Sequence, residues 1–479
     1  MVAFLLCIKG TAELDSESPE LFIPTPGARE RIAHSANAKG LNRGMRLLPL
    51  IAATYFMVSG GPYGIEDILG GGYAAGLILL LVLPLVWSLP TALMIGELAS
   101  ALPEEGGFYV WVRRALGPFW GYQEAWLSLS ASIFDMAIYP TLFVLYLDRL
   151  FPAWTAGWHG AAWELGLIAV CCVWNLLGAP AVGDGSVAFF VLLLSPFVAL
   201  VGVALWHGMH FTGPSVWRQS GGGASLSTAL LVAMWNYMGW DNASTIAREV
   251  ENPRRNYPRA MLASAGIVMV TYAVPLAAMA WAGVPAGRFS TGSWADVART
   301  MVGPWLGLAI VVGGTLTSVG MFNALTMSYA RLPMVMAEDG LLPAGLAWKN
   351  RRSVPWVAVL ACAVAWALAL RFSFERLISL DLILYGGSLI LEFVALIALR
   401  IREPKLERPF YAGRFPLVCL MGAAPTLLIV YACVVSRHEK MAHMPALLLG
   451  ALIAGAGPLL FLVSRAFRKR TAPVLVGGD

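Results

Sequence analysis

Charged residues are scarce in this 479-residue chain, and their scarcity excludes most soluble proteins. Aspartate, glutamate, lysine and arginine together make up 13% of the residues, against about 25% in soluble domains. Hydrophobic residues make up 58%. Because apolar runs of about 20 residues recur along the whole chain, we expect an all-α polytopic membrane protein.

The motifs of enzymes and of cofactor sites are also missing. The six cysteines have no metal-ligand spacing, and most lie in apolar runs. The sequence contains neither the phosphate-binding pattern G-x-x-x-x-G-K-[S/T] nor the zinc pattern H-E-x-x-H. Five of the six histidines lie near expected outer ends of spans, and the sixth lies in the N-terminal tail. We therefore predict no enzymatic activity, no catalytic residues, no cofactor and no bound metal.

The apolar pattern predicts twelve transmembrane spans. They cover residues 46–69, 73–101, 118–147, 160–178, 186–207, 226–248, 258–284, 303–331, 354–371, 376–400, 415–436 and 443–467. Most of the 33 lysines and arginines lie in the segments that share a side with the N-terminus. The positive-inside rule then places both termini in the cytoplasm, and this bias explains the net charge of +5 without a nucleic-acid partner.

The N-terminal tail, residues 1–45, is expected to be cytoplasmic and mobile. It begins MVAFLLCIKG, which lacks a basic region before the apolar stretch, so we expect no signal peptide. The rest of the tail is largely polar, with scattered proline and glycine.

Acidic side chains inside the spans are the strongest functional signal. A carboxylate facing lipid costs several kcal/mol, so deep acids should line a wet cavity, take up protons or bind a cation. No lysine, arginine or histidine lies at mid-depth to pair with them. The deeper acids are Glu66, Asp67, Glu124, Asp135, Asp241 and Glu392, whereas Glu97 and Asp381 lie nearer span ends and rank lower.

Spacing separates these acids further. Glu124 and Asp135 are eleven residues apart, about three helical turns, and share one face of the third span. Glu66 and Asp67 point about 100° apart, which favours Glu66 as the cavity group and Asp67 as a packing partner. For Glu124, near the cytoplasmic end, a hydrogen-bonded packing role and a functional role both stay open.

Two spans contain helix breakers near their middle. The first includes SGGPYG, in which proline removes a backbone donor and glycine costs about 1 kcal/mol relative to alanine. The sixth is interrupted at Gly239, beside Trp240, Asp241 and Asn242. Interruptions five spans apart are expected of inverted-repeat transporters, whose exposed backbone binds substrate at the midplane. Trp235, Tyr237 and Trp240 flank Asp241, and they form either a cage for an ammonium group or ordinary packing.

Two motifs resemble the amino acid/polyamine/organocation (APC) superfamily. They are GELASALPEEGGFYVWVRRALGPFWGYQEAW from residue 96 and EVENPRRNYPRA from residue 249. Within the superfamily, TYFMVSGGPYGIEDILGGG, IFDMAIYPTLF and NYMGWDNAS resemble plant polyamine uptake transporters and kinetoplastid polyamine permeases. The resemblance covers about residues 45–465.

The resemblance implies a LeuT-type 5+5 inverted-repeat fold with helices 1 and 6 discontinuous. The expected parts are a tail at 1–45, a transport core at 46–400 with repeats at 46–207 and 226–400, and helices 11–12 with a tail at 401–479. It also implies proton-coupled polyamine uptake by alternating access, with Trp235 as the gate. The expected substrate-binding residues are Gly60, Gly61, Tyr63, Gly64, Glu66, Asp135, Asn236, Tyr237, Trp240 and Asp241, and the candidates for proton coupling are Asp135, Glu124 and Glu392.

The chain also departs from the superfamily pattern. Pro62, Tyr63 and Glu66 crowd the place where amino-acid carriers receive a carboxylate, and this acidic site favours amines. The fifth span lacks the lysine that carries the proton role in some members. The expected partners are a polyamine or related amine, protons and the lipid bilayer, and the expected location is the plasma membrane. An amino-acid permease remains the alternative, and a nontransporting amine sensor is the further one.

Overall fold

The computed structural model describes residues 45–217, 219, 226–372, 374–435, 440–441 and 444–471. The expected tail at 1–45 lies outside these residues except for Met45. Helices dominate the described part of the chain. A short antiparallel pair, β1 (Lys440–Met441) and β2 (Met444–Pro445), joins the last two helices, with Lys440 opposite Pro445. The all-α class expected from the sequence is confirmed.

Each of the twelve expected spans corresponds to a helix or to an interrupted helix. In chain order they are α3 (Leu47–Val58) with η2 (Glu66–Gly71); α4 (Tyr73–Leu83), η3 (Pro84–Ser88) and α5 (Leu89–Ala101); α7 (Pro118–Asp148); α9 (Trp158–Asn175); α10 (Ala179–His210); α11 (Leu226–Trp235) with η4 (Trp240–Glu249); α12 (Pro253–Trp281); α14 (Pro304–Tyr329); α16 (Trp356–Ala369); α17 (Phe374–Arg402); α18 (Phe415–Val435); and α19 (Ala446–Thr471).

Eight of these helices are long and apolar enough by themselves to cross a membrane. The first and sixth spans fall short because each is divided by its break, and α16 has only 14 residues. The fourth, α9, has 18 residues that include the polar His159 and Glu164. The difference between twelve and eight therefore reflects broken, short or polar spans.

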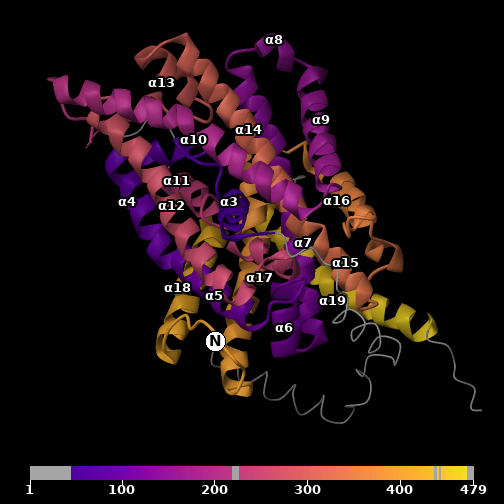
Figure 1. The fold of residues 1–479 in the computed structure, drawn as a ribbon. Helices are drawn as coiled ribbons and strands as arrows, with labels where there is room; N and C mark the ends of the chain where they lie inside the picture. Colours follow the sequence, from indigo (N-terminus) through magenta and orange to yellow (C-terminus); the bar gives the residue numbers. More distant parts are fainter. Residues whose placement is uncertain are drawn as a thin grey trace, which may run out of the picture. The chain divides into compact units, whose positions relative to one another are not determined.

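Short elements lie at the two ends of the helix bundle. Figure 1 shows α8 (Pro152–Thr155) and α13 (Trp294–Met301) at one end, called the outer end below, and α6 (Phe108–Leu116) at the other, called the inner end. The remaining short elements are η5 (Ala286–Arg288), α15 (Arg331–Glu338) and η6 (Ala344–Ala347).

Helix packing repeats when each span is replaced by the span five places away. The third span packs on the tenth (α7 on α17), and the eighth packs on the fifth (α14 on α10). Likewise α12 packs on α3 as α5 packs on η4, and α16 packs on α7 as α9 packs on α14. This exchange relates the first five spans to the second five, as expected of an inverted repeat.

Three of the acids that the sequence singles out, Glu124, Asp135 and Glu392, lie on the most enclosed helices. In the apolar stretch of each helix, 83% of α17 and 72% of α7 is buried, against 22% of α19. Polar side chains on α7 and α17 therefore face other helices rather than lipid. These two helices, with the broken spans 1 and 6, position the candidate site.

Candidate functional site

The break in the first span is a tight turn between α3 and η2. Gly61 and Gly64 have positive φ values of 70° and 82°, which favour glycine. Side chains bind the released backbone: the Gly61 N–H donates to Oγ of Ser59 at 3.0 Å, and the Gly64 N–H donates to the Tyr146 hydroxyl at 3.3 Å. At Gly60, a Cβ would lie 2.7 Å from a side-chain methyl group of α14. Close packing thus requires small residues here.

The break in the sixth span crosses the first. Gly239, between α11 and η4, has a φ of 87°, and a Cβ there would lie 2.5 Å from the carbonyl oxygen of Met57. Only glycine fits this crossing. The Asn236 side-chain amide donates to the Gly64 carbonyl at 3.3 Å. The two breaks, which the sequence predicts separately, are therefore joined directly.

Asp135, on α7, is buried among neutral donors. Its Oδ1 accepts hydrogen bonds from the Tyr139 hydroxyl at 2.7 Å and the Trp235 indole at 3.4 Å, and its Oδ2 accepts one from the Tyr329 hydroxyl at 3.3 Å. These donors orient the carboxylate without neutralising its charge.

Asp241, in the broken sixth span, has a similar setting. The Tyr385 hydroxyl donates to its Oδ1 at 2.8 Å, and the same hydroxyl accepts the Gly239 N–H at 3.1 Å. Asp241 is 2% exposed and interacts electrostatically with Asp135. The break of span 6 and the third span thus bring two acids together.

Asp381, which the sequence ranks lower, joins this group. It is fully buried on α17, and neither carboxylate oxygen has a hydrogen-bond partner among the described residues. It interacts electrostatically with Asp135 and Asp241. A sequence signal exists: Asp381 precedes Glu392 by eleven residues, the same spacing that separates Glu124 from Asp135.

Glu124 and Glu392 form a second level of acids. The Ser128 hydroxyl donates to Oε1 of Glu124 at 2.8 Å, and Oε2 has no partner in the described chain. Both oxygens of Glu392 also lack one there. Glu392 interacts electrostatically with Asp241 and Glu124.

Together these five acids, the central carboxylates, form two levels. Spans 3 and 10 run in opposite directions, so Asp135 and Asp381 lie at one depth, the outer level, and Glu124 and Glu392 lie at another, the inner level. Asp241 interacts with acids of both levels. Eleven residues of helix separate the levels by about 16 Å. No lysine, arginine or histidine of the described residues forms an ion pair with any of them.

Glu66 and Asp67 lie in a separate group at the outer end. Oε1 of Glu66 accepts hydrogen bonds from the Tyr146 hydroxyl at 2.5 Å and the Gly292 N–H at 3.0 Å. Asp67 accepts the Thr291 N–H at 3.2 Å and its hydroxyl at 2.6 Å. These contacts, the outer closure, fix the broken first span to the loop before α13. Both acids bind this loop, including Glu66, which the sequence favours as the cavity group.

Three other expected site residues direct their polar groups at backbone. The Tyr63 hydroxyl donates to the carbonyl of Ile310 at 3.0 Å, and the Tyr237 hydroxyl donates to that of Leu80 at 2.8 Å. The Trp240 indole donates to the Tyr237 carbonyl at 2.9 Å. The aromatic residues that contact the central carboxylates are Trp235, which the sequence singles out, and three tyrosines of spans 3, 8 and 10. Sequence proximity to Asp241 does not reveal these tyrosines.

Trp235, the expected gate, lies across the outer level of the central carboxylates. Besides its hydrogen bond to Asp135, its ring centre lies 6.3 Å from that of Tyr139 and 5.7 Å, edge-on, from that of Phe374. Its ring also approaches Gly64 of the first break. This position between the acids and the start of α17 suits a gate.

The inner end is joined by charged residues. The Arg331 side chain, 4% exposed, pairs with Glu249 and lies 3.8 Å from Glu105. Arg248 lies 3.6 Å from the same Glu105. These contacts, the inner closure, connect α15, the end of η4 and the segment before α6.

A family model described as "Amino acid permease" matches residues 51–451, which is most of the chain. The chain belongs to the amino acid permease family. With its apolar spans, the permease is a multi-pass integral membrane protein, and the family agrees with the LeuT-type arrangement expected from the sequence.

Several similar proteins are named polyamine transporters. The permease is 35% identical over 399 residues to "Polyamine transporter PUT1" of Oryza sativa subsp. japonica, covering 82% of this chain and 74% of that protein. It is 34% identical over 413 residues to "Probable polyamine transporter At3g19553" of Arabidopsis thaliana, covering 82% and 83%. "Serine/threonine exchanger SteT" of Bacillus subtilis (strain 168) is more distant, at 25% over 357 residues, 72% of this chain and 80% of that protein.

Proposed function

We propose that this permease takes up polyamines by proton-coupled secondary transport across the plasma membrane, with both termini in the cytoplasm. The observation that carries the proposal is the set of five central carboxylates that have no basic partner among the described residues. Such acids in a dry interior need protons or a cationic ligand. The names of the plant relatives support a polyamine as that ligand.

The arrangement favours a long polycation over an amino acid. A substrate carboxylate would be repelled by the acids, whereas separate ammonium groups of one polyamine could bind separate acids. A diamine is the shortest substrate that could contact Asp241 and the outer level at the same time.

The substrate would bind between spans 3, 6 and 10. One ammonium group binds Asp241, and a second binds Asp135 and Asp381, beside the indole face of Trp235. Glu66, whose contacts lie in the outer closure, would attract amines on entry, while Gly60 to Gly64 and Asn236 shape the wall of the site. Tyr63, Tyr237 and Trp240 would hold this wall through their backbone hydrogen bonds.

Alternating access requires the two closures to open in turn. In this structure both are formed, and the central carboxylates are at most 4% exposed, so it represents an occluded arrangement. We assign the coupling proton to the inner level, Glu124 and Glu392, because the ammonium groups are assigned to the other three acids. In this proposal the ten-helix core at 46–400 contains both closures, whereas the tail at 1–45 and the segment at 401–479 stay outside the transport core.

The decisive test is the substitution Asp241→Asn, which keeps the side-chain shape and removes its charge. Uptake of labelled spermidine into cells should be abolished while the amount of protein at the membrane stays unchanged. Asp67→Asn is the matched control, because this acid belongs to the outer closure. Unchanged uptake in the Asp241 variant would refute the site.

An amino-acid permease is the second candidate, supported by the exchanger among its relatives. Competition of spermidine uptake by excess spermine, arginine or leucine separates the two functions. We expect inhibition by spermine and none by leucine. Inhibition by leucine alone would favour the amino-acid permease, and amine binding without accumulation in proteoliposomes would favour a sensor.

A further inference from the structure

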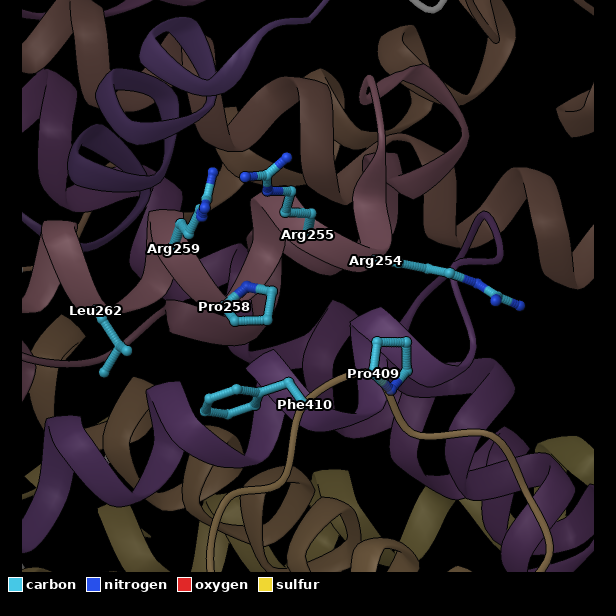
Figure 2. A pocket seen from close by; sticks show the side chains of 7 residues that line it. All are labelled: Arg254, Arg255, Pro258, Arg259, Leu262, Pro409 and Phe410. Atoms are coloured by element: carbon cyan, nitrogen blue, oxygen red, sulfur yellow. The ribbon is translucent and has the colours of Figure 1, made fainter.

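A pocket of about 480 Å³ opens at the inner end of α12, away from the central carboxylates. Figure 2 shows its lining, in which side chains of one helix face a loop. The lining residues are Arg254, Arg255, Pro258, Arg259 and Leu262 of α12, and Pro409 and Phe410 of the segment between α17 and α18.

The loop wall of this pocket is firmly anchored. Glu97 of α5, fully buried, accepts the Ala412 N–H at 2.8 Å and lies 3.3 Å from the Arg408 guanidinium. The ring of Phe410 rests on Gly96, where a Cβ would lie 3.3 Å from the ring. Contacts with the buried Glu97 therefore hold the loop on both sides of Phe410, at Arg408 and at Ala412. The shape of this wall does not depend on a ligand.

Two arginines of the pocket lack a counter-ion. Arg254 pairs with Glu407 at 2.9 Å, but Arg255 and Arg259 form no hydrogen bond or ion pair through their side chains within the described ranges. Figure 2 shows both extending to the same side of the helix, while Arg254 points away from them. They lie one turn apart near the positive end of the helix dipole. A phosphate group can accept hydrogen bonds from both guanidinium groups.

The other half of the pocket is apolar and continues onto the lipid-facing side of α12. Leu262 is exposed and follows Arg259 by about one turn, and Val270 and Val274 are exposed further along the helix. Tyr411, next to Phe410, is also exposed, as aromatic residues at a membrane interface often are. The pocket thus lies where headgroups meet acyl chains.

We propose that this pocket binds an anionic phospholipid of the leaflet at the inner end. Arg255 and Arg259 bind its phosphate, and Phe410 and Pro258 contact the glycerol region. An acyl chain lies along the exposed Leu262, Val270 and Val274 of α12. Basic pockets at the cytoplasmic ends of membrane helices suit such headgroups. The apolar half distinguishes a phospholipid from free phosphate, which would contact only the arginines.

The test compares three probes on the full-length chain purified in detergent and stripped of lipid. Native mass spectrometry and the shift in thermal midpoint report binding of phosphatidylglycerol, phosphatidylcholine and inorganic phosphate. We expect tight binding of phosphatidylglycerol alone. In the double variant Arg255→Gln/Arg259→Gln, its affinity should fall on the order of thirtyfold, given about 1 kcal/mol for each basic residue near an anionic surface.

The matched control is Arg351→Gln/Arg352→Gln, which removes two adjacent exposed arginines of another inner loop. This control should keep the affinity for phosphatidylglycerol. If the double variant does not fold, Arg259→Gln alone should weaken binding severalfold. Equal binding of phosphatidylcholine, binding of inorganic phosphate at the same concentrations, or unchanged affinity in the Arg255/Arg259 variant would each overturn the proposal. None of these measurements depends on transport.

Discussion

Glu97 and Asp381 are equally buried, yet their surroundings are opposite. Glu97 binds the guanidinium groups of Arg400 and Arg408 and the N–H of Ala412. Asp381 has no hydrogen-bond partner among the described residues. Burial alone therefore does not identify a functional acid in this membrane protein. A buried acid without a counter-ion is a candidate, because an unpaired buried charge is costly unless a proton or ligand cation offsets it.

The same contrast separates the inner end from the centre. At the inner end, acids meet arginines: Arg331 pairs with Glu249, and Arg114 pairs with Glu403. The hydrogen bond from Arg114 holds the pKa of the Glu403 carboxyl below its usual range. In the centre, the donors to the carboxylates are tyrosine hydroxyls, an indole and the Ser128 hydroxyl. Fixed cations thus offset acids at the inner end, whereas in the proposed site the substrate would supply the cations that the described residues do not.

The largest effect is expected from Glu97→Gln. This change removes one partner of a buried ion network and leaves Arg400 and Arg408 without a counter-charge, which costs about 3–5 kcal/mol. The thermal midpoint of the purified protein should fall sharply, and little protein should reach the membrane. Asp381→Asn, at an equally buried position, is the control. A Glu97 variant of normal stability and impaired uptake would place this acid among the transport residues.

Asp381→Asn should change transport and stability in opposite directions. Removing an unpaired buried charge should raise stability by about 1 kcal/mol. Loss of one ammonium contact should reduce spermine uptake about tenfold, with a smaller effect on putrescine, which can still bind Asp241. Uptake rates for both amines and the thermal midpoint test this prediction. A fall in stability like that of the Glu97 variant would make Asp381 a structural residue.

The sequence predicts the spans and both breaks because lipid imposes strict rules on the backbone. Long apolar runs must be helices, and proline and glycine at mid-depth must interrupt them. These features are local, so the spacing and composition of residues are enough to predict them. Gly239 shows the limit: the sequence indicates a break there, but only the structure shows that Met57 crosses it.

Which acidic side chains lie together depends on contacts between segments that are distant in the sequence. This grouping therefore could not be predicted from local spacing and composition. Asp381 ranks low as a candidate in the sequence because it lies near the expected end of span 10. Packing of α17 on α7 nevertheless brings it close to Asp135. Conversely, Glu66 looks central, but the loop at Thr291 and Gly292 returns to bind its end of the first span. Neither contact leaves a periodic pattern in the sequence.

Glu392→Gln tests the inner level of the central carboxylates. Glutamine keeps the shape of the side chain but cannot carry a proton. Exchange of labelled spermidine across proteoliposomes should persist within about threefold of the original rate, because a charge change of this kind leaves the amine contacts at Asp241 and Asp135 in place. Accumulation driven by an imposed pH gradient should be lost.

Glu124→Gln should give the same separation of exchange from accumulation, since both acids form one level. Glu403→Gln, which affects a paired acid outside the spans, should leave accumulation unchanged. If Glu392→Gln still accumulates spermidine with the original pH dependence, the coupling proton is carried elsewhere.

The smallest effect is expected from Asp67→Asn at the outer closure. Asparagine can still accept one hydrogen bond from Thr291, and two further contacts hold the same loop: Gly292 to Glu66, and the Trp294 indole to the Pro62 carbonyl at 2.6 Å. Loss of about one hydrogen bond, roughly 1 kcal/mol, should shift the balance between closed and open outer ends only modestly.

The apparent KM for spermidine should therefore change by at most about fivefold, which corresponds to that loss, while the maximal rate of uptake stays near its original value. Concentration series of initial uptake rates measure both quantities. A complete loss of uptake in this variant, matching that of Asp241→Asn, would show that Asp67 contacts substrate. It would then no longer hold that the outer closure only keeps the outer end closed while the central carboxylates bind the substrate.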